Sequence, residues 1–364
     1  MSDIPVICTI ITKSHLPYAR TLARSLVAHH PEIRLHVLLA DEVDGHFDPT
    51  GEPFDWIWLK DLSDAETIRK MCLYYTAFEL CCALRGALYE YLFAQTNAPM
   101  LLFLDADTMV YGALDTIFRQ LENASILLTP HCTVPVPARH VNPHELNFLN
   151  KGLYNAGFLG LRRTDATKRF IAWLKERLEH HAFNDHLSPQ DRLRSFSFVD
   201  YYRHEFVSRR LFVDQLWLNL VPLYFDGVQL CREPGMNVGH WNLFNRHLDK
   251  DALGNIQVDG RPLLLAHFSG WDMDRPDQVS KHAPMYETVP PLWKEIAVDY
   301  RRLLLQNGYE NCRHYPYAFD RLDDGQKITL EDRRKYHDRL LSKPFRSTPL
   351  MHHLLVAIKS GFKR

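Results

Sequence analysis

The sequence lacks a net charge, and it lacks any long uninterrupted apolar run. Lysine and arginine total 43 against 44 aspartate and glutamate residues, which leaves a formal net charge of −1. Without a basic or acidic excess, no global field draws the chain to nucleic acid or a membrane surface, so we expect no nucleic-acid partner. The apolar run from Val6 to Ile11 is too short for a membrane span or a signal-peptide core. We therefore expect a cytoplasmic protein.

The cysteines form no recognisable disulfide or metal-binding pattern. There are seven of them, an odd number, none are spaced as in Cys-x-x-Cys, and Cys81 and Cys82 are adjacent. A disulfide framework and a thiolate zinc site are therefore disfavoured. Internal repeats and low-complexity tracts are also missing from the sequence. What the chain does have is 46% hydrophobic residues over 364 positions, enough to bury a large core.

Short apolar segments alternate with helical patterns along most of the chain. The β-branched stretch 6–12 is followed by apolar residues at helical spacing, and 35–41 and 54–59 have the composition of further buried strands. This alternation predicts an α/β fold with a Rossmann-like, mixed but mostly parallel sheet flanked by helices. The other expected elements are a pair of helices over 64–95, strands over 100–104, 125–130, 154–161 and 261–270, a loop over 133–145, and helices over 165–181 and 211–225, the last ending near Pro222.

Two aspartates follow one of these apolar segments directly. In "LLFLDADTMV", residues 101–110, Asp105 and Asp107 stand at the carboxyl end of an expected strand, where open α/β sheets bind ligands. Side chains at i and i+2 of a continuing strand point to opposite faces, but a turn allows both carboxylates to converge on one cation. Mg²⁺ and Mn²⁺ prefer oxygen ligands and keep positions open for phosphate oxygens. The pattern thus favours metal-assisted handling of a nucleoside diphosphate.

Two other interpretations of these aspartates stay open. Both can be solvated loop carboxylates, although an unpaired charge beside the apolar segment 100–104 costs free energy unless a cation or hydrogen bonds offset it. The ending D-A-D-T also resembles the opening motif of haloacid dehalogenase-type phosphatases, in which Asp105 would be the nucleophile and Asp107 a general acid. That family usually begins its core with this strand, whereas other expected strands precede it here.

Five motifs in order resemble the nucleotide-sugar glycosyltransferases of the GT-A fold, most closely a bacterial branch of family 8. They are "ITKSHLPYARTLARSL", "LFLDADTMV", "YNAGFLGL", "VDQLWLN" and "HFSG", and the resemblance covers residues 5 to about 270. It implies a metal-dependent enzyme that moves a sugar from a nucleotide donor, expected to be a UDP-sugar, onto a glycan or lipid-linked glycan hydroxyl with retention. The alternative from another class is a sugar-nucleotide-binding or glycan-binding module of this fold without turnover.

The resemblance implies roles for individual residues. By it, Asp105 and Asp107 bind Mn²⁺ or Mg²⁺ and His267 of "HFSG" supplies a third ligand, which suits a metal that neutralises a departing diphosphate. Asp214 and Gln215 lie beside the anomeric carbon, where one of them steadies the oxocarbenium-like centre or acts as a transient nucleophile. The residues implied in donor binding are Thr9, Thr12, Lys13, Arg85, Ala106, Asn155, Ala156, Gly157, Gly270 and Lys281.

Two basic residues in this set carry structural alternatives. Lys13 contacts the nucleotide or is an ordinary surface lysine. Arg85 pairs with Asp105 or reaches the donor sugar, and its alternative is a salt bridge with Glu79 or Glu90.

The usual ending of the family pattern is missing from this sequence. A lysine normally follows the His-x-x-Gly turn closely and grips the phosphate, whereas Lys281 stands eleven residues beyond Gly270. Lys281 or Arg275 replaces that lysine only if the loop folds back toward the turn.

The character of the chain changes near residue 276, where charged helical segments with tyrosine-rich patches begin. We therefore expect a nucleotide-sugar-binding catalytic domain over 1–275 and a mainly helical extension over 276–364. The basic tail, 349–364, has apolar residues on one helical side. It either lies on an anionic bilayer at the inner face of the membrane, next to a lipid-linked acceptor, or docks against the catalytic domain.

Overall fold

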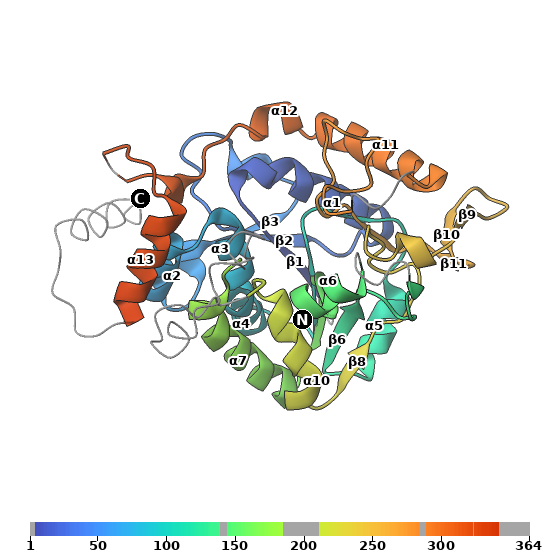
Figure 1. The fold of residues 1–364 in the computed structure, drawn as a ribbon, viewed down its shortest axis with the longest axis horizontal. Helices are drawn as coiled ribbons and strands as arrows, with labels where there is room; N and C mark the ends of the chain where they lie inside the picture. The colour runs from blue at the N-terminus through green and yellow to red at the C-terminus, as the bar shows by residue number, and fades with distance from the viewer. Residues whose placement is uncertain (1–3, 139–143, 185–210, 284–288, 323, 342–364) are drawn as a thin grey trace.

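The computed structural model describes residues 4–138, 144–184, 211–283, 289–322 and 324–341. Among them, seven strands form one central sheet in the order β3-β2-β1-β4-β7-β6-β8 (Figure 1). Strands β1 to β4 run parallel, β7 is antiparallel to both of its neighbours, and β8 is parallel to β6. Their bounds are β3 (Asp55–Trp58), β2 (Leu35–Leu39), β1 (Val6–Ile11), β4 (Met100–Leu104), β7 (Tyr154–Arg162), β6 (Ile126–Pro130) and β8 (Val228–Leu230). The mixed, mostly parallel sheet predicted from the sequence is confirmed.

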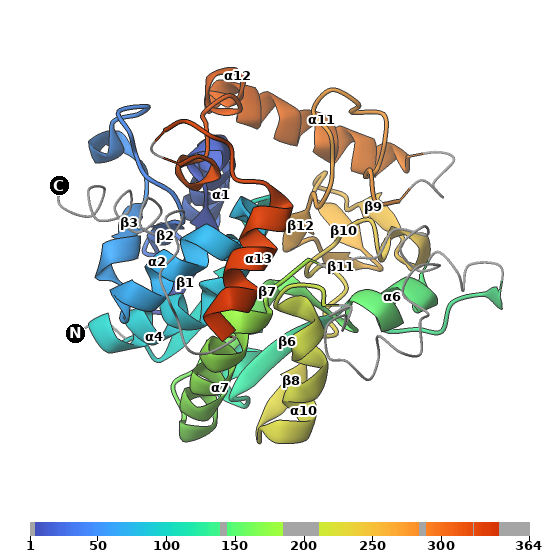
Figure 2. The same cartoon turned by 60° about the vertical axis from the view of Figure 1, so that its left-hand side comes forward.

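The central strands are buried on both faces, which explains their unbroken apolar sequences. Every residue of β1 and β4 is buried. Alternate side chains enter two cores: Phe103 contributes to the one under α2, α3, α4 and α7, and Leu102 to the one under α1 and α5. The sheet is therefore the middle of three layers (Figure 2). These helices are α1 (Leu16–His29), α2 (Ala65–Tyr74), α3 (Ala77–Ala83), α4 (Arg85–Gln95), α5 (Asp115–Glu122) and α7 (Asp165–His181), with the shorter α6 (Glu145–Lys151) and α10 (Val221–Tyr224).

Two helix predictions were wrong in detail. The segment 64–95 forms three helices instead of a pair, because Thr76 and Glu79 make a reciprocal capping box that starts α3 as a new helix. The segment 211–225 does not end at Pro222: a 3₁₀ stretch, η5 (Gln215–Leu220), leads into α10, where this proline occupies the first turn. A proline is well tolerated there because it needs no hydrogen-bonded amide.

Two small sheets lie beside the central one. β5 (Thr108–Val110) pairs antiparallel with β12 (Leu265–His267), and β9 (Leu248–Lys250), β10 (Ile256–Val258) and β11 (Arg261–Pro262) form a meander. The strand expected over 261–270 is therefore two strands in different sheets. The break follows from the hydrogen bonds of its middle, since Leu263 donates to Ile256 but Leu264 donates to Gly235.

The described part of the C-terminal segment packs on the α/β layers. α11 (Pro291–Gln306) and α12 (Tyr309–Cys312) lie over α1, and α13 (Leu330–Leu341) lies beside α2 (Figures 1 and 2). The buried Arg333 of α13 donates to the carbonyls of Cys72, Leu73 and Tyr75 at the end of α2. The 349–364 tail lies outside the described residues, as do 139–143 of the expected loop. No helix within the described ranges is long and apolar enough to cross a membrane. The remaining 3₁₀ turns are η1 (Lys13–His15), η2 (Pro49–Gly51), η3 (Leu59–Asp61), η6 (Leu243–Asn245) and η7 (Ala318–Asp320).

Candidate metal and sugar-transfer site

A tight turn after β4 brings the two aspartates to the same side of the sheet edge. The Asp105 amide still bonds to the Gly157 carbonyl of β7 at 2.9 Å, which extends the ladder to that residue. Thr108 then closes the turn, because its amide and its hydroxyl both donate to the Asp105 carbonyl, at 3.1 and 2.7 Å. The chain reverses within Asp105 to Thr108, so both carboxylates face one region, as the sequence predicted.

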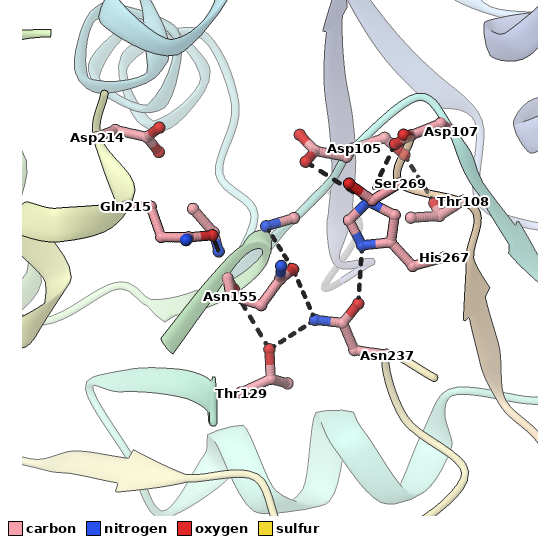
Figure 3. Close-up of polar contacts among 12 residues, drawn as sticks. Asp105, Asp107, Thr108, Thr129, Asn155, Asp214, Gln215, Asn237, His267 and Ser269 are labelled. Atoms are coloured by element: carbon pink, nitrogen blue, oxygen red, sulfur yellow. Dashed lines mark hydrogen bonds and ion pairs between the residues drawn. The ribbon is translucent and has the colours of Figure 1, made fainter. Parts of the chain in front are cut away.

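The pairing of β5 with β12 brings His267 to the aspartates. His267 stands opposite Thr108 in the register, and the Phe268 amide donates to the Asp107 carbonyl at 2.9 Å. The His267 Nε2 lies 3.1 Å from an Asp107 oxygen and 3.8 Å from an Asp105 oxygen (Figure 3). One potential ligand atom from each of the three residues falls within 4.8 Å of the others. Two carboxylates and one imidazole suit Mn²⁺ or Mg²⁺ in their donor chemistry.

Arg85 links this cluster to the second pair of expected site residues. As the first residue of α4, it donates from one guanidinium nitrogen to Asp105 at 2.6 Å and pairs through the other with Asp214 at 2.7 Å. The latter nitrogen also donates to the Ala156 carbonyl. The predicted pair of Arg85 with Asp105 is confirmed, and a contact with the donor sugar stays a prediction. Glu79 pairs with Arg334 and Glu90 with Lys175 instead.

The electrostatics of the cluster follow from burial and from these pairs. Burial disfavours the Arg85 charge, but Asp214 and Asp105 outweigh it and raise the pKa of Arg85 above its usual range. Burial raises the pKa of Asp214, against the opposing effect of the guanidinium. Burial also acts to raise the pKa of Asp107, yet His267 beside it holds that pKa below its ordinary value. The same contact raises the pKa of His267 against its own burial.

Strand β7 lies between the Asp105 and Asp107 pair and the Asp214 and Gln215 pair. The Gln215 side chain accepts from the Ala156 amide at 3.2 Å and donates to the Lys151 carbonyl at 2.9 Å, so η5 is fixed against this strand. Gly157 is required for the approach of His267, because a Cβ there would lie 2.2 Å from the imidazole Cε1. In Figure 3, Asp214 and Gln215 lie across the site from Asp107. Two further residues expected to bind the donor, Asn155 of β7 and Ala106 between the two aspartates, are both buried.

The first strand contributes differently from the expectation. Lys13 is not exposed: its Nζ is buried, lies 2.5 Å from Asp44 and 3.5 Å from Asp41, and donates to the Glu42 carbonyl. The surface-lysine alternative is therefore wrong, and a nucleotide contact by Lys13 stays a prediction. Thr9 is fully buried within β1, and in the described part of the chain its hydroxyl has no hydrogen-bond partner.

Thr12 lies at the sheet edge and supports a residue that sequence reasoning missed. Its hydroxyl is 3.1 Å from Nδ1 of His15, whose imidazole is exposed. The position of His15 at the end of the short η1 turn puts an exposed ring at the carboxyl end of β1. The motif containing it was noted in the sequence, but nothing in its spacing separated this histidine from its neighbours.

The loop after His267 does fold back. The Lys281 amide donates to the Gly270 carbonyl at 2.9 Å, and the Ser280 hydroxyl donates to the Ser269 carbonyl at 2.8 Å. Gly270 has a φ of 66°, and a Cβ there would lie 2.2 Å from the ring of His282. The exposed Lys281 is thus beside the His-x-x-Gly turn, which was the condition for its expected role.

A second set of residues missed from the sequence lies behind His267. Asn237, Thr129 and His131 are buried. Asn237 contacts the imidazole directly, Thr129 bonds to Asn237, and His131 connects to Asn237 through Asn155. Asn237 stands in the noted segment "EPGMNVGHWNLFNRH". No periodicity singles it out, because its contact depends on a bridge between Val238 and Ala266 that only the tertiary structure creates.

Comparison with known proteins gives distant relatives. No protein-family model matches the chain. The uncharacterized proteins YfnF and YfnD of Bacillus subtilis (strain 168) are each 24% identical to it, over 275 and 272 residues. These matches cover 72% and 73% of this chain, and 80% and 77% of the relatives.

Two similar solved structures are glycosyltransferases. One is galactosyltransferase LgtC in complex with donor and acceptor sugar analogues, with a TM-score of 0.47, 16% identity, and coverage of 83% of this chain and 96% of that one. The other is glycosyltransferase GlyE of Streptococcus pneumoniae TIGR4, with a TM-score of 0.44, 14% identity, and coverage of 86% and 66%.

Proposed function

We propose that this chain is a metal-dependent glycosyltransferase that moves a sugar from a nucleotide donor, a UDP-sugar, to a hydroxyl of a glycan or lipid-linked glycan with retention. The observation that carries the proposal is a continuous polar path from Asp107 and His267, through Asp105 and Arg85, to Asp214. It joins a cluster suited to a divalent cation to a buried carboxylate at the carboxyl edge of a mostly parallel sheet, where such folds bind ligands.

Asp105, Asp107 and His267 would hold Mn²⁺ or Mg²⁺ in this proposal. When bound, the metal neutralises charge on the diphosphate leaving group and so lowers the barrier to its departure. The protein's own contribution is to keep three ligand atoms within 4.8 Å of one another before the donor arrives. Their arrangement is fixed by backbone pairing, since Thr108 faces His267 across β5 and β12.

Asp214 and Gln215 would act at the sugar. Asp214 is buried and pairs with Arg85, whose guanidinium opposes the effect of burial on the pKa of this carboxyl. Its carboxylate is a candidate nucleophile or stabiliser of positive charge. Gln215 is held by Ala156 and Lys151 at both ends of its amide, so it suits a positioning role for the donor. Thr12, Asn155, Gly270 and Lys281 surround the same edge and are the further donor contacts we propose.

Release of nucleoside diphosphate from a panel of nucleotide sugars, with and without Mn²⁺, tests this function. We expect release that depends on Mn²⁺, and we expect Asp214→Asn to slow it by about 100-fold or more while Mn²⁺ still binds. Glu52→Gln is the matched control, because it also breaks a buried pair, and its partner Arg20 bonds to Glu52 and Asn307 and to none of the expected site residues, all of which the structure describes. Donor affinity without release would support the binding-module alternative. A phosphoaspartate trapped at Asp105 would instead support the phosphatase alternative.

A further inference from the structure

We propose that Asn237 is a positioning residue that holds a hydrogen on Nδ1 of His267, which leaves Nε2 as the nitrogen available to a metal beside Asp105 and Asp107. This rests on the proposed function only in its use of a metal at that corner. Asn237 is 1% exposed, and its side chain contacts the expected metal ligand His267 and the expected donor residue Asn155, so a metal titration without donor is needed to isolate its effect on the imidazole.

The hydrogen-bond network determines which way the Asn237 amide points. Its Nδ2 lies 2.8 Å from the Thr129 hydroxyl oxygen and 3.0 Å from Oδ1 of Asn155. Both atoms are acceptors here, because the Thr129 hydroxyl donates to the Asn155 carbonyl and Oδ1 of Asn155 already accepts from the Gly157 amide. A flipped amide would place its oxygen against two acceptors, so the NH₂ end must face them.

This orientation dictates the protonation of the imidazole. With both amide hydrogens used, Oδ1 of Asn237 faces Nδ1 of His267 at 3.0 Å (Figure 3). An amide oxygen can only accept, so Nδ1 must carry a hydrogen. In the neutral ring Nε2 then holds a lone pair, and Nε2 is the atom 3.1 Å from Asp107. A metal-binding histidine is commonly held by such a bond on its other nitrogen.

Backbone hydrogen bonds hold the Asn237 segment beside the strand that carries His267. The His267 amide donates to the Val238 carbonyl at 2.7 Å, and the Val238 amide donates to Leu265 at 2.9 Å. Asn237 itself has a φ of 51°, a left-handed conformation that asparagine tolerates better than most residues. The side chain of Asn242 donates to its carbonyl at 3.1 Å. Movement of the amide relative to the ring is therefore restricted.

Titration of the full chain with Mn²⁺ alone, followed by the electron-spin-resonance signal of the free ion, tests the proposal. We expect Asn237→Ala and Asn237→Gly to weaken Mn²⁺ binding by about 10 to 100-fold. The glycine variant relieves any strain at positive φ, so a loss shared by both reports the missing amide. Asn307→Ala is the control, since it removes another buried amide, bonded to Thr21, away from the site. Unchanged affinity in folded Asn237 variants would overturn the proposal.

A second measurement needs neither metal nor a variant of Asn237. Long-range ¹H–¹⁵N spectra of the parent with labelled histidine, at alkaline pH and without metal, report which imidazole nitrogen is protonated. His267→Gln identifies the resonance. We expect the Nδ1-protonated form, and an Nε2-protonated ring would refute the assignment. Because neither assay contains a nucleotide sugar, a protein that passes both but releases no nucleoside diphosphate would contradict the proposed function alone.

Discussion

Two pairs of aspartates at the carboxyl edge of the same sheet face different partners. After β2, Asp41 and Asp44 lie within 3.5 and 2.5 Å of the buried Lys13 ammonium, and we call these three residues the lysine corner. After β4, Asp105 and Asp107 face His267, and these three residues are the metal corner. Both corners place two carboxylates just beyond a buried parallel strand, so strand position alone does not distinguish a structural ion cluster from a ligand site.

The difference lies in the cation that each corner already contains. Lys13 is a compact point charge, and it is 0% exposed, so the lysine corner is neutralised from within the chain. In the metal corner, one guanidinium nitrogen of Arg85 contacts Asp105 and another contacts Asp214, and the partner of Asp107 is the His267 imidazole. That corner therefore keeps oxygen and nitrogen atoms that an added divalent ion can use. The comparison predicts that the two corners respond oppositely to substitution.

The largest effect is expected for Asp107→Ala, which removes one of the three ligand atoms. We expect the affinity for Mn²⁺ to fall by more than about 100-fold, since losing even an outer partner of a metal ligand costs about 10 to 100-fold. The fold should be kept, because the turn depends on Thr108 and on backbone atoms. Calorimetric titration with Mn²⁺ measures the loss. Asp41→Asn is the matched control in the lysine corner, and an equal loss there would erase the distinction between the corners.

Lys13→Met should produce the reverse result. It leaves Asp41 buried without its cation, and breaking a buried pair in this way costs about 3 kcal/mol of the free energy of unfolding. The affinity for Mn²⁺ should stay within about twofold of the parent, because no group of the metal corner contacts Lys13. Urea unfolding and metal titration of the same sample measure both quantities. A variant as stable as the parent would show that the lysine corner contributes nothing to the fold.

Gly157→Ala tests the space that the metal corner requires. An added Cβ would lie 2.2 Å from the His267 ring and 2.8 Å from the Asn155 amide oxygen, so the imidazole must move. We expect Mn²⁺ affinity to fall by about tenfold or more through this displacement. Gly160→Ala on the same strand is the control, because its closest contact would be a side-chain atom at 3.1 Å. Equal affinities for the two variants would mean that His267 is not held where it binds metal.

The sequence predicted the metal corner better than the lysine corner, for a physical reason. The apolar run before Asp105 predicts the end of a buried strand, and the turn that follows needs only local hydrogen bonds from Thr108. The partners of Lys13 lie after another strand, so its burial depends on how β1 and β2 pair. Asn237 was missed for the same reason, since its contact with His267 joins an irregular segment to strand β12.

In segment 64–95, a local capping signal marks a helix boundary that apolar periodicity does not show. Apolar spacing over 64–95 is continuous, and it hides the breaks between three helices. The Thr76 and Glu79 pair at capping-box spacing was readable in the sequence and marks one of those breaks. The 3₁₀ character of η5, which aims Asp214 and Gln215, has no such local mark, so the geometry of the proposed catalytic pair came only from the structure.

The smallest effect is expected for Glu42→Gln, which tests whether the lysine corner is fully neutralised. Burial, together with Asp44 and Asp41, raises the pKa of Glu42 to about 7 from 4.5, so the folded state retains a proton that the unfolded chain releases earlier. Stability linked to this group is therefore complete below pH 4.5 and is lost as the pH rises through about 7. Because the side chain is partly exposed, we expect Glu42→Gln to stabilise the protein by only about 1 kcal/mol at pH 8, and by less at pH 5. Urea unfolding at the two pH values measures the difference, and a gain that is larger at pH 5 would mean that Lys13 holds this carboxylate ionised.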